Sequence, residues 1–252
     1  MPPMGLGNGL GLGLSNGAKA SGAAPLTPST VAGNVLYITN DVGVVGSAGK
    51  LVSWADQSAS PKNTTVGSNS PNYTAGTGLG GGAKIDILAT GTAILGATSI
   101  VASGADRTIF MVIQALAPGT VGDLICFKQG TPLLAVRYDT AGNTTGDESS
   151  FSNTGTYTSN TSPHVIEVTY SVGVASPYYI DGVLIAQAAP HVAVSDSGAA
   201  AGFNIGGAGP ITAGTFTGQV AAALVYNSVL SAANRSTVRV GLGAKFGITV
   251  TP

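Results

Sequence analysis

Charged side chains are scarce in this chain of 252 residues. Lysine and arginine number 10, aspartate and glutamate 11, and together they make up 8% of the sequence, against about 25% in an average soluble domain. The net charge of −1 leaves no basic excess for a nucleic acid. A free monomer usually carries more charge for solubility. We therefore expect either that neighbouring molecules in an assembly cover much of the surface, or that the protein is secreted with a serine- and threonine-rich exterior.

The chain has almost no cysteine, and it lacks the apolar segments of a secretory signal and of a membrane helix. Cys126 is the single cysteine, which excludes an intramolecular disulfide framework. Its apolar neighbours predict a small buried side chain rather than a nucleophile. The N-terminus lacks the basic and apolar regions of a secretory signal, and no apolar run approaches the roughly 20 residues of a membrane helix. Both absences fit a protein that is made inside a cell and released by lysis, and we expect no membrane partner.

The acidic pairs that would support glycoside hydrolysis are also missing. Glu148 and Glu167 are the only glutamates, and a glycoside hydrolase needs two facing carboxylates. Glu167 has no acidic neighbour two residues away in either direction. His191 lies in a predicted loop and His164 at the start of a predicted strand, where histidines are rarely catalytic. We therefore expect no catalytic site.

Two groups of oxygen-bearing side chains lie close enough in sequence to consider for Ca²⁺, which takes several carboxylate or carbonyl oxygens. They are Asp139, Asn143, Asp147 and Glu148 in one group, and Asp56, Gln57 and Asn63 in the other. Neither group has regular spacing, and no glycine run is followed by the Lys-Ser/Thr and helix start of a phosphate-binding loop. We therefore expect no metal site and no cofactor.

Short apolar or alternating segments, separated by turn residues, dominate the chain after its first 30 residues. They predict strands at 35–39, 51–55, 84–88, 108–117, 124–128, 133–138, 164–170, 177–180, 183–186, 203–206 and 216–226. Asp181-Gly182 lies between two of these segments and is a two-residue hairpin signal. About ten to twelve strands predict an all-β fold, a sandwich of two antiparallel sheets. Trp54, the single tryptophan, is expected in its core, and 40–50, 58–83, 139–162 and 187–202 are expected to be loops.

One helix is predicted after the last strand. Ser231 can cap its N-terminus, and the apolar residues Val238, Leu242 and Phe246 recur every four positions. Gly247 stands where a helix stop is expected. A long buried strand that leads into one late helix implies that the preceding chain is sheet.

Three segments resemble the concanavalin A-like, or laminin-G-like, jelly-roll family. They are Phe216-x-Gly-x-Val-Ala with the following Leu-x-x-Lys-Phe-Gly-Ile248, Val52-Ser-Trp-Ala-Asp-Gln-Ser58, and Tyr178-Tyr-Ile-Asp-Gly182. The resemblance covers roughly residues 34–249, and such domains are common in bacteriophage virion proteins and bacterial surface proteins. It implies a jelly roll spanning 31–252. Ala222 departs from the family, which usually has an acidic residue there, and we expect this face of the strand to pack closely against something apolar.

Residues 1–30 form a separate, low-complexity segment rich in glycine, alanine and leucine. Leu6, Leu10, Leu12 and Leu14 are separated by even numbers of residues, so they share one side of an extended chain. Such a segment either is a tail or adds to a sheet edge or groove of a neighbouring molecule. Gly/Leu-rich openings also recur in virion proteins of the resembled family, and we interpret residues 1–30 as an assembly arm.

Three functions remain open. The favoured one is a non-enzymatic virion structural protein, a capsid decoration or cement protein that is assembled in the host cytoplasm and contacts the major capsid protein or copies of itself as a homo-oligomer. The second is a carbohydrate- or receptor-binding module of a tail fibre, for which Tyr73, Phe151 and Tyr157 are the candidate ligand-contacting aromatics. The third is a bacterial surface adhesin. The sequence does not distinguish capsid from tail.

The assembly-arm hypothesis makes a prediction. Each leucine buried against a partner contributes roughly 1.5–3 kcal/mol, whereas ordering the arm costs about 1–2 kcal/mol per residue, so the arm needs a partner to become ordered. Deleting residues 1–30 should leave a folded domain that no longer joins the particle, as measured by the occupancy of the truncated protein in purified particles. Incorporation at normal occupancy would show that the arm is only a tail.

Overall fold

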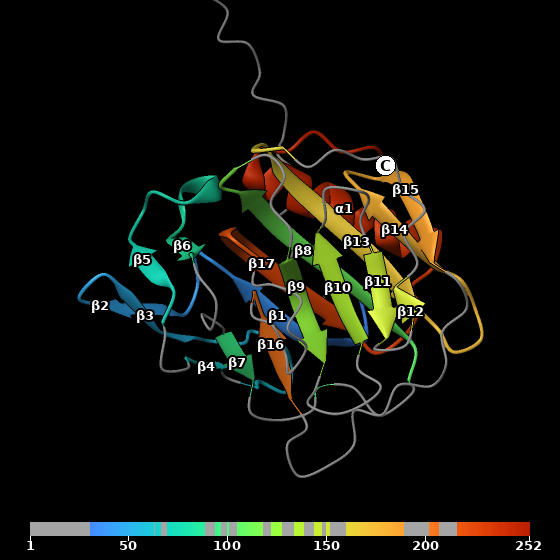
Figure 1. Ribbon diagram of the computed structural model, residues 1–252, viewed down its shortest axis with the longest axis horizontal. Helices are drawn as coiled ribbons and strands as arrows, with labels where there is room; N and C mark the ends of the chain where they lie inside the picture. Colours follow the sequence, from blue (N-terminus) through green and yellow to red (C-terminus); the bar gives the residue numbers. More distant parts are fainter. Residues whose placement is uncertain are drawn as a thin grey trace, which may run out of the picture.

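A computed structural model describes residues 31–62, 64–66, 70–88, 94–96, 100, 105–117, 122–127, 134–138, 144–147, 150–151, 160–188, 202–206 and 216–252. Within them the chain forms 17 strands, one short 3-10 turn and one α-helix (Figure 1). In chain order they are β1 (Asn34–Thr39), β2 (Val44–Ser47), β3 (Lys50–Trp54), β4 (Thr64–Val66), β5 (Asn72–Thr74), η2 (Leu79–Gly81), β6 (Lys84–Ile87), β7 (Ile94–Gly96), β8 (Arg107–Ala115), β9 (Gly122–Phe127), β10 (Leu134–Tyr138), β11 (Thr144–Asp147), β12 (Ser150–Phe151), β13 (Pro163–Tyr170), β14 (Ser176–Ile180), β15 (Val183–Ala188), β16 (Phe203–Ile205), β17 (Gly218–Tyr226) and α1 (Ala232–Phe246).

The first sheet is built around β8 and β17, which pair antiparallel over most of their length. β13 pairs with the other side of β8, and β14 and β15 continue from it. β1 lies along the far side of β17. Every residue of β17 is buried, which is typical of a strand that is covered on both faces.

The second sheet is built around β9. β10, β11 and β12 follow on one side, and β16, β7 and β4 on the other. Figure 1 shows β9, β10 and β16 in front of β8, β13 and β17. β3 joins the two sheets, because it pairs with β4 on one side and, through β5 and β6, leads back to β17. All of these pairings are antiparallel, so the predicted all-β sandwich is confirmed.

The alternation of β8 divides its side chains between two hydrophobic cores. Ile109 and Met111 belong to the core between the sheets, whereas Phe110 and Val112 belong to the core under α1. This is the period-2 placement expected of a strand. The molecule therefore has three layers, namely two sheets and a helix.

A β-bulge and small side chains let β17 pack closely against α1. Ala221 is the extra residue between Val220 and Ala222, where the register against β8 shifts. Val220 packs in the core between the sheets, and Ala221 and Ala222 both pack in the core under α1. The expectation that the Ala222 face lies against something apolar is confirmed, and the apolar partner is the helix of the same chain.

α1 begins and ends as the sequence predicts. The hydroxyl of Ser231 accepts a hydrogen bond from the backbone N–H of Asn234 at 3.3 Å, and Gly247 closes the helix with φ 70°. Val238, Leu242 and Phe246 are buried against the first sheet. Burial of such side chains stabilises the fold by roughly 1.5–3 kcal/mol each.

Several sequence-based boundaries are wrong. The segments expected to be loops contain β2 in 40–50, β4 and β5 in 58–83, and β11 and β12 in 139–162, and β7 was not expected at all. The strand number is therefore higher than predicted. These strands are two to four residues long, and most are rich in threonine, glycine or asparagine, so pairing with neighbours rather than an apolar pattern creates them. Two side-chain expectations are confirmed, since Trp54 is fully buried and donates Nε1–H to the carbonyl of Thr39 at 2.9 Å, and Cys126 is buried in β9.

The predicted Asp181-Gly182 hairpin turn is present and holds the C-terminal segment. Both residues have positive φ, 51° and 85°, as a type I′ turn requires. The carbonyl of Asp181 accepts a hydrogen bond from the N–H of Thr251 at 2.8 Å. Gly182 lies so close to the tail that a Cβ there would overlap the carbonyl oxygen of Thr251. The turn between β14 and β15 thus holds the C-terminal segment after α1 in place.

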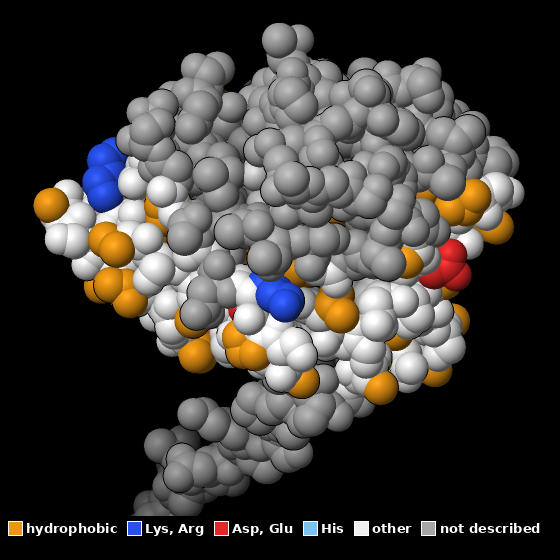
Figure 2. Space-filling model, turned by 90° about the horizontal axis from the view of Figure 1, so that it is seen from below, with side chains coloured by type: hydrophobic (Ala, Val, Ile, Leu, Met, Phe, Trp, Pro, Cys, Tyr) orange, Lys and Arg blue, Asp and Glu red, His pale blue; other side chains and the backbone are white. Residues whose placement is uncertain are grey.

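Among the residues that Figure 2 colours by type, few side chains are charged, and hydrophobic ones are scattered across the face. The described part of this face is therefore sparsely charged, as the sequence is. Within the described residues, no helix has the length and hydropathy to cross a membrane.

The packing of Gly182 predicts a difference between two glycine substitutions. Gly182 and Gly173 both have positive φ, so alanine costs about 1–2 kcal/mol in backbone strain at either position. At Gly182 the new Cβ would also overlap the Thr251 carbonyl and lie 2.9 Å from Nε of Arg239. At Gly173 it would meet no atom within 4 Å. Gly182→Ala should therefore lower the free energy of unfolding by a further 1–3 kcal/mol or so, measured by chemical denaturation. Equal losses would contradict the tight contact.

Candidate functional site

An open cavity lies where β1, β2, β5 and the start of β6 meet. Its volume is about 260 Å³, and its lining comes from Asn40, Asp41, Gly43, Val44, Tyr73, Ala75, Gly76, Gly81, Gly82 and Ala83. We call it the Tyr73 cavity. Most of these residues are small, so backbone forms much of the wall, and Tyr73 is its single aromatic side chain.

Asn40 fixes one wall of the Tyr73 cavity. It follows β1 directly, and its backbone N–H donates to the carbonyl of Ala221 at 2.8 Å. Its side-chain Nδ2 donates to the carbonyls of Leu79 and Ala83, both at 3.0 Å. A Cβ at Gly82 would lie 2.5 Å from Oδ1 of Asn40, so the glycine is required for this approach. The amide of Asn40 therefore ties the end of β1 to the segment 79–83.

Tyr73 presents an aromatic ring from β5. Its backbone N–H donates to the carbonyl of Gly49 at 2.9 Å, which sets β5 against the β2–β3 hairpin. The ring packs on the backbone of Gly46, where a Cβ would overlap it. Tyr73 is only partly buried and also contacts the core between the sheets. The contact with Gly46 and with the core restrains the ring, and Tyr73 both lines the cavity and is partly exposed.

Asp41 supplies the charge of the Tyr73 cavity. Its Oδ2 lies 2.7 Å from Nζ of Lys245 on α1, and 40% of its side chain is exposed. Burial raises the pKa of the Asp41 carboxyl, but hydrogen bonds from Lys245 and from Thr39 outweigh it, so the pKa is lowered overall. Asp41 is therefore an ionised hydrogen-bond acceptor over the whole neutral pH range.

These groups suit a small polyhydroxylated ligand. An aromatic ring offers an apolar face, an ionised carboxylate accepts hydrogen bonds from hydroxyl groups, and glycines allow a ligand to approach the backbone closely. A Cβ at Gly76 or Gly81 would meet no atom within 4 Å, so the space beside these two residues is open. The cavity has no general base and nucleophile in contact with each other.

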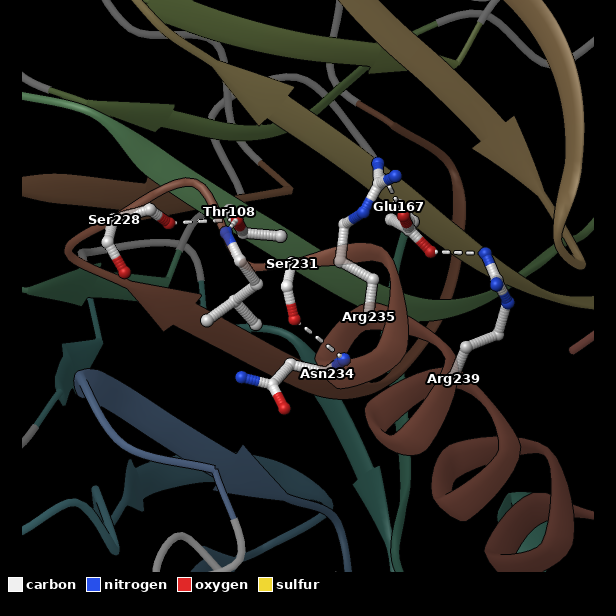
Figure 3. A network of polar contacts seen from close by, with 8 residues as sticks. Thr108, Glu167, Ser228, Ser231, Asn234, Arg235 and Arg239 are labelled. Atoms are coloured by element: carbon white, nitrogen blue, oxygen red, sulfur yellow. Dashed lines mark hydrogen bonds and ion pairs between the residues drawn. The ribbon is translucent and has the colours of Figure 1, made fainter.

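Glu167, one of the two glutamates of the chain, is part of a buried ion-pair cluster. It is fully buried in β13 between two arginines of α1 (Figure 3): Oε2 accepts from Nη1 of Arg239 at 2.7 Å, and Oε1 lies 3.3 Å from Nη1 of Arg235. Burial raises the pKa of the Glu167 carboxyl, and the two guanidinium groups oppose this shift without cancelling it. A carboxyl sealed between two arginines has no access to substrate.

The start of α1, which carries both arginines, is positioned by Thr108 (Figure 3). The hydroxyl of Thr108 donates to the carbonyl of Ser228 and accepts from the N–H of Leu230, both at 2.9 Å. Thr108 is buried in β8. The central strand therefore sets the direction in which the chain turns from β17 into the helix.

His164 stands at the start of β13, as predicted, and it is buried, with 7% exposed. Its Nδ1 lies 2.7 Å from Oδ2 of Asp181, and its Nε2 lies 3.0 Å from Oδ1 of Asn160. Oδ1 of Asn160 also accepts from the N–H of Ser162 at 2.7 Å. A carboxylate and an amide thus occupy both ring nitrogens, and neither is a nucleophile, so this histidine joins the hairpin turn to β13.

Asp56 is likewise structural. Its carboxylate accepts four hydrogen bonds, from the N–H groups of Tyr37, Ser58 and Lys62 and from the hydroxyl of Ser58, at 2.8 to 2.9 Å. Nε2 of Gln57 donates to the hydroxyl of Thr39. These donors occupy the oxygens that a cation would need. Across the part of the chain that the structure describes, no three acidic, histidine or cysteine side chains come together as a metal site.

Two of the remaining candidates lie on described strands. Phe151 ends β12, where it pairs with Gly146, and Asp147 ends β11. The other positions named from the sequence lie outside the described residues: Leu6, Leu10, Leu12, Leu14, Asn63, Asp139, Asn143, Glu148, Tyr157 and His191. Of the three predicted ligand aromatics, the structure thus places Tyr73 alone at a described cavity.

Sequence reasoning missed most of the Tyr73 cavity. Asn40 and Asp41 directly follow a predicted strand, and polar residues at strand ends are a known signal for binding loops. Their partners, Leu79 and Lys245, are too distant in sequence to be inferred from spacing. The same holds for Arg235 and Arg239, whose separation by four residues places them on one helix face but does not reveal Glu167 opposite.

The fold is shared with solved structures of other proteins. A mutant of Trypanosoma rangeli sialidase displaying trans-sialidase activity matches with a TM-score of 0.61 and 15% identity, over 89% of this chain and 37% of that chain. Domain 4 of AbnA, an extracellular arabinanase from Geobacillus stearothermophilus, in complex with arabinotriose, matches with a TM-score of 0.55 and 14% identity, over 84% of this chain and 98% of that one. The receptor-binding domain of botulinum neurotoxin D matches with a TM-score of 0.56 and 13% identity, over 83% and 53%.

These similarities concern the fold. The chain spans little more than a third of the sialidase structures that it matches. No protein-family model matches the chain, and no curated protein matches it by sequence. The β-sandwich expected from the jelly-roll resemblance is thus found in the structure and its neighbours, whereas the link to virion proteins stays a prediction.

The buried ion pairs predict a pH-dependent loss of stability. Arg239→Met removes the guanidinium that hydrogen-bonds Glu167 and leaves Arg235, 3.3 Å away, as its remaining partner. A buried carboxylate that loses its hydrogen bond in this way costs about 1–3 kcal/mol near pH 7. Because burial holds the pKa of Glu167 above its usual value, the folded state binds this proton more tightly than the unfolded state does. Stability from this group is therefore present at low pH and lost as pH rises through the raised pKa. Denaturation with guanidinium should show the loss shrinking as pH falls from neutral through this raised pKa.

Two further variants act as controls. The double variant Glu167→Gln with Arg239→Met removes the buried carboxylate that lost its hydrogen bond and should recover much of the loss. Lys84→Met breaks the Lys84–Asp86 pair, which is 3.0 Å long with 39% of the lysine side chain exposed, and should cost no more than about 1 kcal/mol. A loss for Arg239→Met that equals the loss for Lys84→Met would contradict the proposed burial cost.

Proposed function

We propose that this chain is a non-catalytic carbohydrate-binding β-sandwich domain, and that it contacts the sugar at the Tyr73 cavity. The observation that carries the proposal is the combination of a fixed, partly exposed aromatic ring and an ionised, partly exposed carboxylate on one open cavity. A sugar has an apolar face formed by its C–H groups and a rim of hydroxyls, and the cavity offers a partner for each.

The size of the Tyr73 cavity limits the ligand. Pockets for drug-sized molecules have roughly 300–1,000 Å³, whereas the Tyr73 cavity has about 260 Å³ and is open to solvent. One sugar ring, at the end or within a longer chain, fits this volume. Affinity for a single ring in an open cavity is low, and repeated copies on one particle would compensate by avidity.

The absence of hydrolysis is part of the proposal. Glu167 has no access to solvent, and His164 is held by Asp181 and Asn160. Neither can act as an acid or a base on a bound sugar. Structural neighbours include sialidases, a domain in complex with arabinotriose and a receptor-binding domain, so ligand binding is one of the uses of this fold and supports the proposal.

We also propose that the protein is displayed on a virion, a location that is compatible with sugar binding. The sparse charge on the face seen in Figure 2 and the 8% charged residues of the whole chain fit a protein that works in an assembly, as a capsid decoration protein or as part of a tail fibre. Mass spectrometry of purified particles would test this location, and the copy number would distinguish head from tail.

Glycan binding is predicted to depend on Ala75 and Tyr73. Ala75 is exposed on the turn after β5 and lines the cavity, so Ala75→Trp should fill the cavity without disturbing the core, while Ala75→Ser should leave it open. Tyr73→Ala should remove the apolar face, and Tyr73→Phe should keep it. On an array of defined oligosaccharides, followed by calorimetry with the best ligand, Ala75→Trp and Tyr73→Ala should each lower affinity at least about tenfold.

The outcome is decisive in both directions. Binding by the unmodified protein that both conservative variants keep and both disruptive variants lose supports the Tyr73 cavity. Equal binding by all five proteins would move the site elsewhere, and no binding to any glycan of the array would overturn the proposed function. Melting temperatures of the variants separate loss of the site from loss of the fold.

A further inference from the structure

A second cavity lies at the opposite end of β13 from His164. Its volume is about 400 Å³, and it is enclosed by the turn between β13 and β14, by Asp106 before β8, and by the connection between β17 and α1. It shares no lining residue with the Tyr73 cavity. We call it the Arg235 cavity.

The wall of the Arg235 cavity is largely apolar and uncovered. Val174 is 55% exposed and Val229 is 44% exposed, and both line the cavity together with Leu230. Large apolar side chains that are exposed beside a cavity are typical of ligand-binding sites. They offer a surface on which the C–H face of a ligand can rest.

Arg235 places a positive charge in this wall. Its guanidinium carbon lies 5.2 Å from the ring centroid of Tyr179, which holds the side chain in place. Its Nη1 is 3.3 Å from Glu167, but the closer, hydrogen-bonded partner of Glu167 is Arg239 at 2.7 Å. Nε of Arg235 is buried without a hydrogen-bond partner among the described residues.

The charge balance favours an anion at Arg235. One carboxylate faces two guanidinium groups, so the cluster carries one excess positive charge. Arg235 is the more exposed of the two arginines, 18% against 8%, and it is the one that lines the cavity. A carboxylate is the planar anion that a guanidinium binds best.

The other polar groups of the cavity favour a hydroxylated ligand. Thr169 and Ser171 contribute hydroxyl groups, which donate and accept hydrogen bonds. Asp106 is exposed and has no ion-pair partner among the described residues. Its carboxylate repels a plain anion but accepts hydrogen bonds from hydroxyls. A ligand with a carboxylate at one end and hydroxyls at the other satisfies both charges.

We propose that the Arg235 cavity binds a carboxylate-bearing sugar, with the carboxylate on Arg235, the hydroxyls toward Asp106, and the C–H face on Val174 and Val229. The inference shares with the proposed function the idea that this chain binds glycans, but it uses a separate cavity. Either site can fail without the other.

The test compares uronic acids with their neutral parents. Calorimetry or ligand-detected NMR with glucuronate and galacturonate, against glucose and galactose, should show binding of the two acids at least about tenfold tighter than that of the neutral sugars. Arg235→Met should abolish this preference. This variant leaves the Glu167–Arg239 pair balanced in charge, so its melting temperature should stay close to that of the unmodified protein.

A matched pair of variants avoids the buried cluster altogether. Val174 is exposed, so neither Val174→Glu nor Val174→Lys disturbs the core, and both remove the same apolar side chain. Val174→Glu should weaken uronate binding several-fold more than Val174→Lys. Ala75→Trp, in the Tyr73 cavity, should leave uronate binding unchanged.

Three outcomes would overturn the inference. They are equal binding of uronates and neutral sugars, equal effects of the two Val174 variants, and loss of uronate binding in Ala75→Trp, which would place the acid in the Tyr73 cavity. Failure of the Tyr73 variants to affect any glycan, with uronate preference intact at Arg235, would reject the Tyr73 cavity as a sugar site and leave this inference standing.

Discussion

The structure depends on a central sheet that is apolar on both faces. β8 and β17 bury side chains toward the second sheet and toward α1 alike, so the sandwich alone would leave one of their faces in water. A single helix covers that face. Burial of its three core residues offers several kcal/mol, which is comparable with the total stability of a domain. Misplacing α1 would therefore endanger the whole fold.

Polar contacts fix the helix at both ends. At its start, Thr108 of the central strand bonds to Ser228 and Leu230, and Glu167 faces the two arginines one and two turns into the helix. After its end, the tail bonds to the Asp181-Gly182 turn. Apolar burial supplies the stabilisation, but it is non-directional, and these buried polar groups select one position of the helix because each would be costly if left unpaired.

The sequence was sufficient for the elements that bury apolar surface and insufficient for those that do not. β8, β13, β17 and α1 follow apolar patterns, and their bounds came out within about two residues. β2, β4 and β5 are short, and β2 and β5 line the Tyr73 cavity. Pairing across distant segments creates these strands, so local sequence carries little signal. Tyr73 was inferred because aromatics in polar segments are rare here. Asp41 and Lys245 are 204 residues apart, and only the folded chain brings them together.

The same constraint decides where ligands can bind. The helix and the second sheet cover both faces of β8 and β17, so these central strands offer no open face to a ligand. The two cavities lie instead at strand ends and turns, where glycines and short strands leave space beside the packed layers. Each also touches α1 through one cation, Lys245 at the C-terminal end and Arg235 near the N-terminal end. The helix that stabilises the fold thus also sets the charge of both candidate sites, and a change in its position would alter both together.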